Sequence, residues 1–394
     1  MKLLICTQKV DANDSNLAFF VRWIEEFAKH CEQVTVICLE EGKHRLPANV
    51  QVYSLGKIKN QEKKITRFTY ALRFWRIIWW ERRNYDAVFV HMNPEYVLLG
   101  GWLWRCLGKK VGLWYTHRSR RLLRMAIPWL ANVFTASQDS FPIQTPKLYV
   151  TGHGIDIDRF KPREFPLDID RKIVAPRVVS IGRVARSKNL DKTIQACALL
   201  RDREIDFNFF IIGAPITDDD KKYEVELKEL VKQLGLACKD GMVISQKKQD
   251  TMKDDARERL RLLKEVVISK IDNAFRKVVF KGHIDYSYIR NQYTTADVMV
   301  VQDNSGGQNK VALEAMATGL PILTSNRAYR KVLGNDWEKL SFDVGDTGRL
   351  ALKMEEIFGM SEDEKKELGR RLRERVVWCH NLVNLIPVIV EALR

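Results

Sequence analysis

The chain has 394 residues, of which 45% are hydrophobic, so it is long enough for two domains that each bury a full core. Seven scattered cysteines without a CxxC pair exclude a disulfide framework and a zinc site, and we expect no metal. No apolar run reaches membrane-spanning length, and the first apolar run is too short for a signal peptide. We therefore expect a cytoplasmic protein with reduced thiols.

The formal net charge of +16 is distributed unevenly. Residues 1–172 carry roughly +11 of it, and the remaining residues carry about +5. A basic first half favours a polyanionic partner, which can be nucleic acid, an anionic membrane or a phosphorylated substrate. The alternative is that the charge serves only solubility.

Short apolar strands alternate with amphipathic helices in the first half of the chain. The predicted strands cover residues 3–7, 34–39, 87–91, 112–115 and 133–136. The helices between them are predicted to begin near Asn16, Thr66, Pro94 and Ser119. Strand–helix alternation of this kind predicts an α/β domain with a doubly wound parallel sheet.

Three polar residues of the first half are candidates for the acceptor side of a site. Asp11 and Asp14 follow the first strand, where they can contact an acceptor. Alternatively, residues 14–16 merely cap the next helix, which is the better-supported interpretation. His91 ends a strand, where ligands of parallel sheets bind. A lone histidine on a strand is more often a packed core residue, and this alternative stays open for His91.

Two stretches combine cations with aromatic residues. The stretch 57–83, from Lys57 to Arg83, holds nine Lys and Arg residues against two Glu residues. Its interleaved aromatic residues are Phe74, Trp75, Trp79 and Trp80. The stretch 102–124, from Trp102 to Arg124, repeats the pattern.

Such helices favour a peripheral position on an anionic membrane, where cations meet headgroups and indoles lie at the interface. The alternatives are core-packed tryptophans under a solvated charged face and, less favoured, stacking on nucleic-acid bases. We predict the membrane surface and expect no nucleic-acid partner.

The second half repeats the α/β alternation after a linker at residues 158–177, which contains three prolines. Its predicted strands cover residues 178–181, 207–213, 278–281, 298–301 and 322–324. The two halves together predict two Rossmann-like domains, with ligands beyond the carboxyl ends of the strands in a cleft between them. A long charged helical segment at residues 246–277 has no assigned role.

A basic loop follows the strand that ends at Gly182. Arg183 and Lys188 lie on this loop, and a helix is predicted to begin near Asn189, a good N-cap residue. An arginine offers a fork of donors and a lysine a mobile point charge, a pair that suits a diphosphate. The alternative is an ordinary basic surface loop.

The most informative segment covers residues 306–321. A strand runs into Gly306 and Gly307, which let a ligand approach the backbone, and a helix follows. Its first amides are unpaired and form an anion site. The residues at this helix start are Asn309, Lys310 and Val311. Glu314, one turn further, can accept hydrogen bonds from sugar hydroxyls, so the segment indicates a nucleotide sugar. A buried helix of any α/β protein is the alternative.

The run Leu313-Glu314-Ala315-Met316-Ala317-Thr318-Gly319-Leu320-Pro321-Ile322 resembles the signature of GT-B glycosyltransferases, specifically the retaining family 4 (group 1). The loop with Arg183 and Lys188 resembles the family's GR…K loop, whose pair neutralises the leaving nucleotide diphosphate. Residues 151–160 are similar to its interdomain NGVD…F stretch, with His153 where Asn is usual.

Two further landmarks resemble the family. Residues 279–285 match its F.G strand end, which makes His283 and Ile284 candidates for contact with the nucleobase. Thr116 and His117 resemble its T-x-H position, where a histidine lies beside the transferred sugar. The family usually carries two glutamates with seven residues between them; here Gly306 replaces the first, and Asp303 is a nearby substitute.

The resemblance implies an acceptor-side domain at residues 1–165, with a final helix at residues 378–394 packing back on it, and a nucleotide-sugar domain at residues 173–377. It implies a hexosyltransferase that uses a UDP-sugar or GDP-sugar and retains configuration. His117 and Glu314 would act in catalysis. We expect an acceptor that is lipid-linked or a cell-surface glycan precursor. The competing hypothesis is a catalytically degenerate nucleotide-sugar-binding protein of the same fold.

Overall fold

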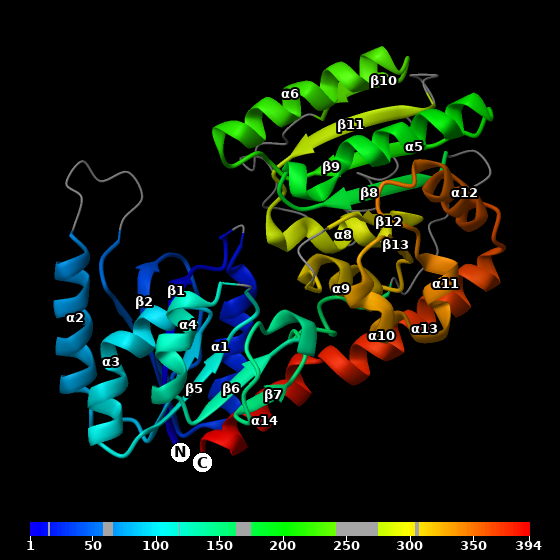
Figure 1. The fold of residues 1–394 in the computed structure, drawn as a ribbon. Helices are drawn as coiled ribbons and strands as arrows, with labels where there is room; N and C mark the ends of the chain where they lie inside the picture. Colours follow the sequence, from blue (N-terminus) through cyan, green and yellow to red (C-terminus); the bar gives the residue numbers. More distant parts are fainter. Residues whose placement is uncertain (15, 58–65, 118, 163–174, 242–274, 304–306) are drawn as a thin grey trace. The chain divides into compact units, whose positions relative to one another are not determined.

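The computed structural model describes residues 1–14, 16–57, 66–117, 119–162, 175–241, 275–303 and 307–394. The chain divides into two compact units, residues 1–157 with 377–394 and residues 158–376 (Figure 1). Each unit is a parallel sheet covered by helices. The predicted α/β class with two doubly wound parallel sheets is therefore confirmed.

The first unit is built on a seven-stranded sheet in the order β3-β2-β1-β4-β5-β6-β7, with every pairing parallel. Its strands are β1 Lys2–Val10, β2 Gln33–Glu41, β3 Val50–Ser54, β4 Ala87–His91, β5 Lys110–Trp114, β6 Asn132–Thr135 and β7 Leu148–Val150. Its main helices are α1 Ala18–His30, α2 Arg67–Trp80, α3 Pro94–Cys106, α4 Arg121–Ala126 and α14 Leu382–Leu393.

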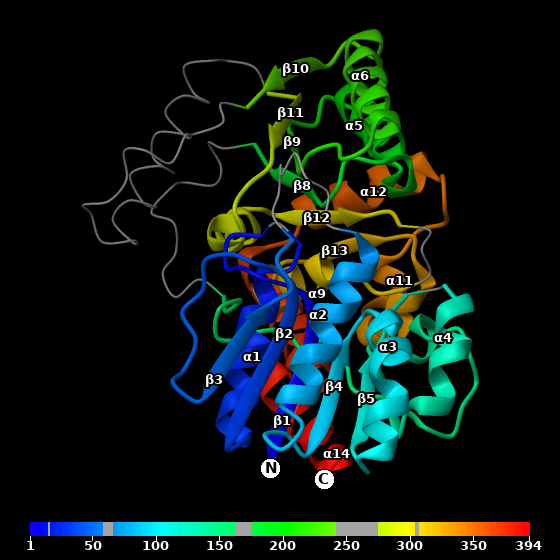
Figure 2. The same cartoon turned by 90° about the vertical axis from the view of Figure 1, so that its left-hand side faces the viewer.

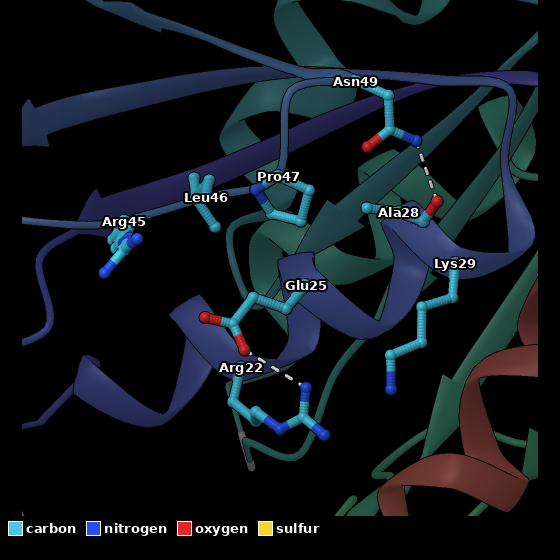
Figure 3. Close-up of a pocket in the computed structure, with 8 residues that line it drawn as sticks. All are labelled: Arg22, Glu25, Ala28, Lys29, Arg45, Leu46, Pro47 and Asn49. Carbon is cyan, nitrogen blue, oxygen red and sulfur yellow. Dashed lines mark hydrogen bonds and ion pairs between the residues drawn. The ribbon is translucent and has the colours of Figure 1, made fainter.

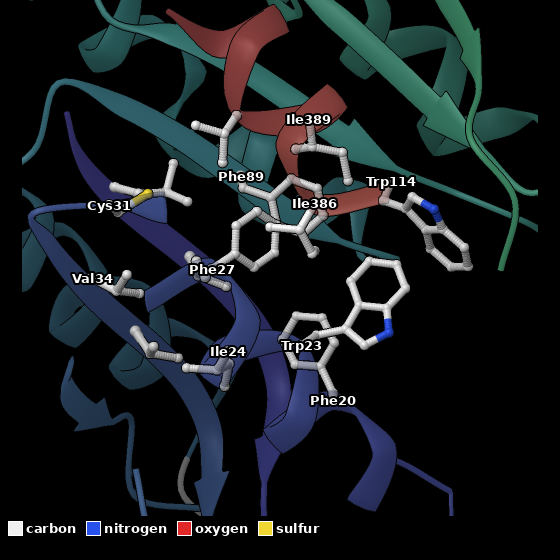
Figure 4. Packing of buried hydrophobic residues seen from close by; sticks show 14 of the residues in the cluster. Phe20, Trp23, Ile24, Phe27, Cys31, Val34, Phe89, Trp114, Ile386 and Ile389 are labelled. Atoms are coloured by element: carbon white, nitrogen blue, oxygen red, sulfur yellow. The ribbon is translucent and has the colours of Figure 1, made fainter. Parts of the chain in front are cut away.

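Helices cover both faces of this sheet (Figure 2). On one face, apolar residues of α1 at helical spacing pack with α14 and the strands. Figure 4 shows this core, in which Phe20, Trp23 and Phe27 of α1 lie near Ile386 and Ile389 of α14. On the other face, α2, α3 and α4 bury a second core. The C-terminal helix α14 thus belongs to the first unit.

The second unit holds a six-stranded parallel sheet in the order β10-β11-β9-β8-β12-β13. Its strands are β8 Arg177–Ile181, β9 Asn208–Ile212, β10 Ala237–Asp240, β11 Lys277–Gly282, β12 Val298–Val301 and β13 Ile322–Thr324. Its helices are α5 Leu190–Asp202, α6 Asp218–Gln233, α8 Ile289–Thr294, α9 Lys310–Ala317, α10 Arg330–Leu333, α11 Trp337–Leu340 and α12 Thr347–Phe358. Helix α13, Glu362–His380, contains the boundary between the units.

The ten predicted strands are all present, whereas β3, β7 and β10 were not predicted. These three lie at sheet edges and are half-buried or exposed, so they lack the apolar run by which a central strand is recognised. Asn189 is the N-cap residue of α5, as predicted, but it lacks the expected side-chain hydrogen bond. Its backbone is left-handed, with φ of 46°.

Several features bear on compartment and chemistry. All seven cysteines are free thiols. Within the described ranges, no helix combines the length and apolar character that crossing a bilayer requires. Two predicted segments lie outside the described residues: residues 163–174 of the linker and residues 246–274 of the charged segment.

Candidate functional site

Two segments far apart in the sequence meet at the carboxyl edge of the six-stranded sheet. Lys188 follows β8, Asp303 follows β12, and these two strands pair in parallel. Lys188 Nζ forms an ion pair with Asp303, and Asn309 Nδ2 donates a hydrogen bond to Oδ2 of the same carboxylate at 2.8 Å. Asp303 thereby joins the basic loop to the residue that precedes helix α9.

Arg183 lies on the same loop and is separated from the end of β8 at Ile181 only by Gly182. Its side chain is 46% exposed, and its Nε lies 3.8 Å from Oδ2 of Asp220, which caps helix α6. The ends of β8 and β9 approach so closely that a Cβ at Gly213 would lie 1.8 Å from the Gly182 carbonyl oxygen. Only glycine fits there, and this close approach fixes where the loop with Arg183 begins.

The segment before α9 is held by side chains rather than by a helix cap. The carbonyl oxygen of Gly307 accepts a hydrogen bond from Asn326 Nδ2 at 2.8 Å. The backbone N–H of Asn309 donates to the hydroxyl of buried Tyr329 at 2.5 Å. Lys310 and Val311 begin α9 and are half-buried. Gly306, predicted beside Gly307, lies outside the described residues.

Glu314, which the sequence predicts to accept hydrogen bonds from sugar hydroxyls, is a buried residue of α9. Its side chain is only 2% exposed. Tyr286 donates a hydrogen bond to Oε1 at 3.0 Å, and Tyr293 donates one to Oε2 at 3.1 Å. Burial raises the pKa of Glu314 to about 7, although the charge of Lys310, the two tyrosine hydroxyls and the charge of Arg159 oppose this rise.

The two candidates for nucleobase contact lie on the loop that connects β11 to Tyr286, the residue that donates a hydrogen bond to Glu314. His283 is exposed, with Nε2 3.7 Å from Oδ1 of Asp285, and Ile284 is half-buried. Tyr286 begins a short 3-10 turn, Tyr286–Tyr288, at the end of this loop. One short segment therefore carries both the base candidates and a hydroxyl that contacts Glu314.

In the first unit, His117 and His91 differ sharply. His117 is exposed after β5, and its Nδ1 accepts a hydrogen bond from the Ser119 backbone N–H at 3.2 Å, so its neutral form carries the proton on Nε2. His91 is 2% exposed and stacks between the rings of Phe20 and Trp114, with centroid distances of 4.1 Å and 5.5 Å. This packing favours the core alternative for His91.

The two aspartates of the first loop surround a buried lysine. Lys9 Nζ lies 3.5 Å from Asp11, 3.0 Å from Asp14 and 2.6 Å from Glu40. Asp14 Oδ1 also accepts hydrogen bonds from the N–H groups of Asn16 and Leu17 at 2.9 Å, just before α1. These bonds order the turn before α1, but the N-cap position of α1 is Leu17, which has no side-chain capping hydrogen bond, so Asp14 does not occupy the N-cap. Contact of Asp14 with an acceptor stays a prediction.

A surface pocket of about 430 Å³ lies elsewhere in the first unit, between α1 and the segment that leads into β3 (Figure 3). None of the predicted site residues lines it. Two of its cations have carboxylate partners: Arg22 pairs with Glu25 at 3.1 Å and Lys29 with Glu26 at 2.7 Å. The charge that this pocket offers a ligand is therefore largely compensated.

The comparisons with known proteins decide the class of this molecule. Residues 170–253 and 253–359 match two family descriptions that both read glycosyl transferases group 1. The chain is a glycosyltransferase, with group 1 domains at residues 170–359. These matches cover the loop with Lys188, the segment with Asp303 and helix α9, so the residues that meet at the sheet edge belong to the glycosyltransferase domain. No curated protein matches this glycosyltransferase in sequence.

Solved structures show that the glycosyltransferase has the GT-B fold. HepE of Anabaena in complex with UDP-glucose is 14% identical with a TM-score of 0.69, covering 100% of this chain and 99% of that chain. Sucrose-phosphate synthase of Thermosynechococcus elongatus is 16% identical with a TM-score of 0.63, covering 99% and 97%. The lipopolysaccharide outer core galactosyltransferase WaaB is 11% identical with a TM-score of 0.60, covering 100% and 99%.

Sequence reasoning missed the tyrosine partners of Glu314 and the ion pair of Lys188 with Asp303. Tyr286 and Tyr293 lie in a segment whose aromatic residues equally fit a hydrophobic core.

No group of three or more His, Cys, Asp or Glu side chains that could hold a metal ion occurs among the described parts of the chain. The groups assembled at this edge are cations, amides, hydroxyls and two nearly buried carboxylates.

The raised pKa of Glu314 predicts a pH dependence of stability. Below about pH 4.5, Glu314 is protonated in both the folded and the unfolded protein. Between about pH 4.5 and 7, Glu314 ionises in the unfolded chain while it stays protonated in the folded protein, so the free energy of unfolding falls as pH rises. Above about pH 7 the loss is complete, at about 3 kcal/mol. Urea unfolding should show the Glu314→Gln variant gaining about this much over the wild type as pH rises through the window. Parallel pH profiles would contradict the burial argument.

Proposed function

We propose that this glycosyltransferase moves a hexose from a nucleoside-diphosphate sugar to an acceptor that is lipid-linked or a cell-surface glycan precursor, with retention of configuration as in family 4. The observation that carries the donor class is the cluster of Lys188, Asp303 and Asn309. It joins the two segments that the sequence independently assigns to a diphosphate. Retention rests on the resemblance to the family.

A UDP-sugar is the favoured donor, because the HepE structures that share the fold contain UDP, UDP-glucose, or UDP with glucose. A GDP-sugar is the alternative that the test must include. A screen of UDP-sugars and GDP-sugars without acceptor, in which release of nucleoside diphosphate is measured, identifies the base and the sugar of the donor together. Release from none of them, with binding retained, would favour the degenerate binding protein.

The proposed roles follow from charge and position. Arg183 and Lys188 neutralise the diphosphate, and the backbone at Gly306 and Gly307 and the start of α9 at Lys310 and Val311 offer it N–H groups. The N–H of Asn309 already donates to Tyr329, so Asn309 orders this segment. His283 and Ile284 contact the base. Glu314 accepts hydrogen bonds from ribose hydroxyls, and Asp303 takes the position of the missing first glutamate beside the donor sugar.

Removal of the loop cations should weaken binding of the nucleoside diphosphate. We expect Arg183→Ala to lose about 2–3 kcal/mol of binding free energy, the scale of a charge-assisted contact. Lys188→Ala alone would also leave the charge of nearly buried Asp303 less compensated, which destabilises the fold. The variant Lys188→Met with Asp303→Asn removes both charges and separates the two effects.

Calorimetry with UDP and GDP measures this loss. Lys221→Ala is the matched control, since Lys221 is an exposed cation of the same unit, paired with Asp218 on α6. An Arg183→Ala variant with the affinity of the Lys221→Ala control would remove Arg183 from the diphosphate site.

The exposed histidine of the first unit is proposed to act beside the transferred sugar. His117→Ala should lower turnover by about 10–100-fold, the effect of one hydrogen bond made in the transition state, while leaving diphosphate affinity nearly unchanged. Steady-state release of nucleoside diphosphate gives the turnover, and calorimetry gives the affinity. His44→Ala is the control, because His44 pairs with Glu41 at 3.0 Å in the same unit. Equal losses in turnover and affinity would assign His117 a structural role.

The proposed membrane surface, here the aromatic–basic face, is the outward side of α2, α3 and α4. On α2 the exposed residues recur every three or four positions, as on one side of a helix. The exposed apolar residues of the aromatic–basic face are Phe68, Leu72, Trp79, Trp80, Trp102 and Met125. Its exposed cations include Arg67, Arg76, Arg83, Arg105, Arg121 and Arg124. This combination supports reversible docking at the cytoplasmic face of an anionic membrane.

Not every aromatic residue of the two stretches belongs to this face. Trp104 is fully buried, and the indole N–H of half-buried Trp75 donates to the Leu99 carbonyl oxygen at 2.8 Å. Trp80, in contrast, is 71% exposed. The core alternative is thus correct for Trp75 and Trp104, and the membrane proposal rests on the others.

Reversal of the charge on this face should release the protein from vesicles. With Arg67, Arg76 and Arg83 changed to Glu, binding to anionic vesicles should fall at least about 100-fold, because each cation contributes about 1 kcal/mol and the new charges repel the surface. Co-sedimentation at low and high salt measures this, since salt screens the attraction. The control changes three exposed lysines of the second unit, Lys221, Lys232 and Lys366, to Glu. Equal binding of the wild type to neutral and anionic vesicles would contradict the proposal.

A further inference from the structure

The carboxylate of Glu314 is closed off by two tyrosines that differ in their freedom to move. Tyr293 is completely buried on α8 and packs edge-on against Phe160, with centroids 5.9 Å apart. Tyr286 is half-buried and lies on the loop that carries His283 and Ile284. Because Glu314 is only 2% exposed, a ligand hydroxyl reaches its carboxylate only if a neighbouring side chain moves.

Tyr286 is the neighbour whose side chain can move with the smaller loss of burial, because it is half-buried whereas Tyr293 is completely buried. Its backbone is fixed, since its carbonyl oxygen accepts a hydrogen bond from Arg159 Nη2 at 2.8 Å. The Arg159 guanidinium lies over its ring, 4.4 Å from the centroid. A rotation of the side chain, with the backbone held by Arg159, would withdraw the hydroxyl from Glu314. Both tyrosine rings pack edge-on against Phe160 with centroids 5.9 Å apart, so the difference between them is burial, which is complete for Tyr293 and partial for Tyr286.

The chemistry of the two contacts makes them exchangeable with a sugar. Each tyrosine presents one hydroxyl to a different oxygen of the carboxylate, as a vicinal diol would. We propose that Tyr286 and a ribose hydroxyl of the donor compete for the Oε1 atom of Glu314. Tyr286 is then a displaceable gate for the ribose, and Tyr293 is a positioning residue that keeps Glu314 oriented. This inference rests on the proposed function, in which Glu314 binds the donor's ribose.

The competition gives the two tyrosines opposite effects on binding. Donor binding must break the Tyr286 hydrogen bond, so Tyr286→Phe removes a competitor and should tighten UDP binding about 3–10-fold, the scale of the net contribution of one hydrogen bond. Tyr293→Phe removes the orienting hydrogen bond and should weaken UDP binding about threefold or more. A residue with a merely structural role would not tighten binding when it is removed.

The test is calorimetry of the full chain with UDP and with 2′,3′-dideoxy-UDP, at pH 8.5 so that Glu314 is ionised. Tyr286→Phe should tighten binding of UDP and leave binding of the dideoxy compound unchanged. The matched control is Tyr53→Phe, which removes another tyrosine–glutamate hydrogen bond, from Tyr53 to Glu81 Oε1 at 2.8 Å in the first unit. This control should bind both compounds as the wild type does.

Three outcomes would overturn the inference. Unchanged or weaker UDP binding by Tyr286→Phe would make Tyr286 a structural residue. Equal binding of UDP and dideoxy-UDP by the wild type would show that ribose hydroxyls do not reach Glu314, and the donor proposal would survive. If the wild type binds neither UDP nor GDP, the proposed function itself fails. Repetition with GDP and dideoxy-GDP covers the other base.

Discussion

The parallel pairing of β8 with β12 is the constraint on which the proposed donor site of this glycosyltransferase depends. Parallel strands present their carboxyl ends at one edge, so Lys188 and Asp303, 115 residues apart in sequence, emerge together there. Asp303 is nearly buried, and a buried carboxylate is costly unless it is paired. The fold therefore needs the cation of Lys188 at the position where the proposed function also uses it. An anionic ligand arriving here adds a second negative partner for a lysine that is already oriented.

The sequence predicts the central strands and fails where tertiary contacts decide. Central strands are apolar runs because helices cover both sheet faces, whereas β10 is a polar edge strand that resembles a loop. Lys188 and Arg183 are predictable, since a basic loop between a strand and a helix is visible in the sequence. The two tyrosines of Glu314 are not, because a buried tyrosine can pack for its ring alone. Only the fold shows that both hydroxyls turn to one carboxylate.

The same limit applies to the tryptophans. Composition indicates an interfacial helix, but it does not say which indoles face outward. On α2, Phe74 and Ile78 face the core, so the neighbours on the opposite side, including Trp79 and Arg76, are left exposed. Arg82 lies over the Trp79 ring at 4.3 Å, so cation and indole already form one unit on this surface. The helical register thus separates the structural tryptophans from those available to a partner.

The electrostatics of Glu314 connect fold stability with the proposed donor binding. Burial favours the protonated acid, while the charges of Lys310 and Arg159 and two tyrosine hydroxyls favour the carboxylate, so the group is balanced near neutral pH. A donor would disturb this balance in two directions. Its ribose hydroxyls would favour the carboxylate, whereas its diphosphate would offset the nearby positive charge and favour the acid. Because Tyr286 already supplies a hydroxyl at Oε1, exchange for a ribose hydroxyl keeps the carboxylate hydrogen-bonded throughout. A buried acid can therefore serve as a sugar ligand here without ever being left as an uncompensated charge.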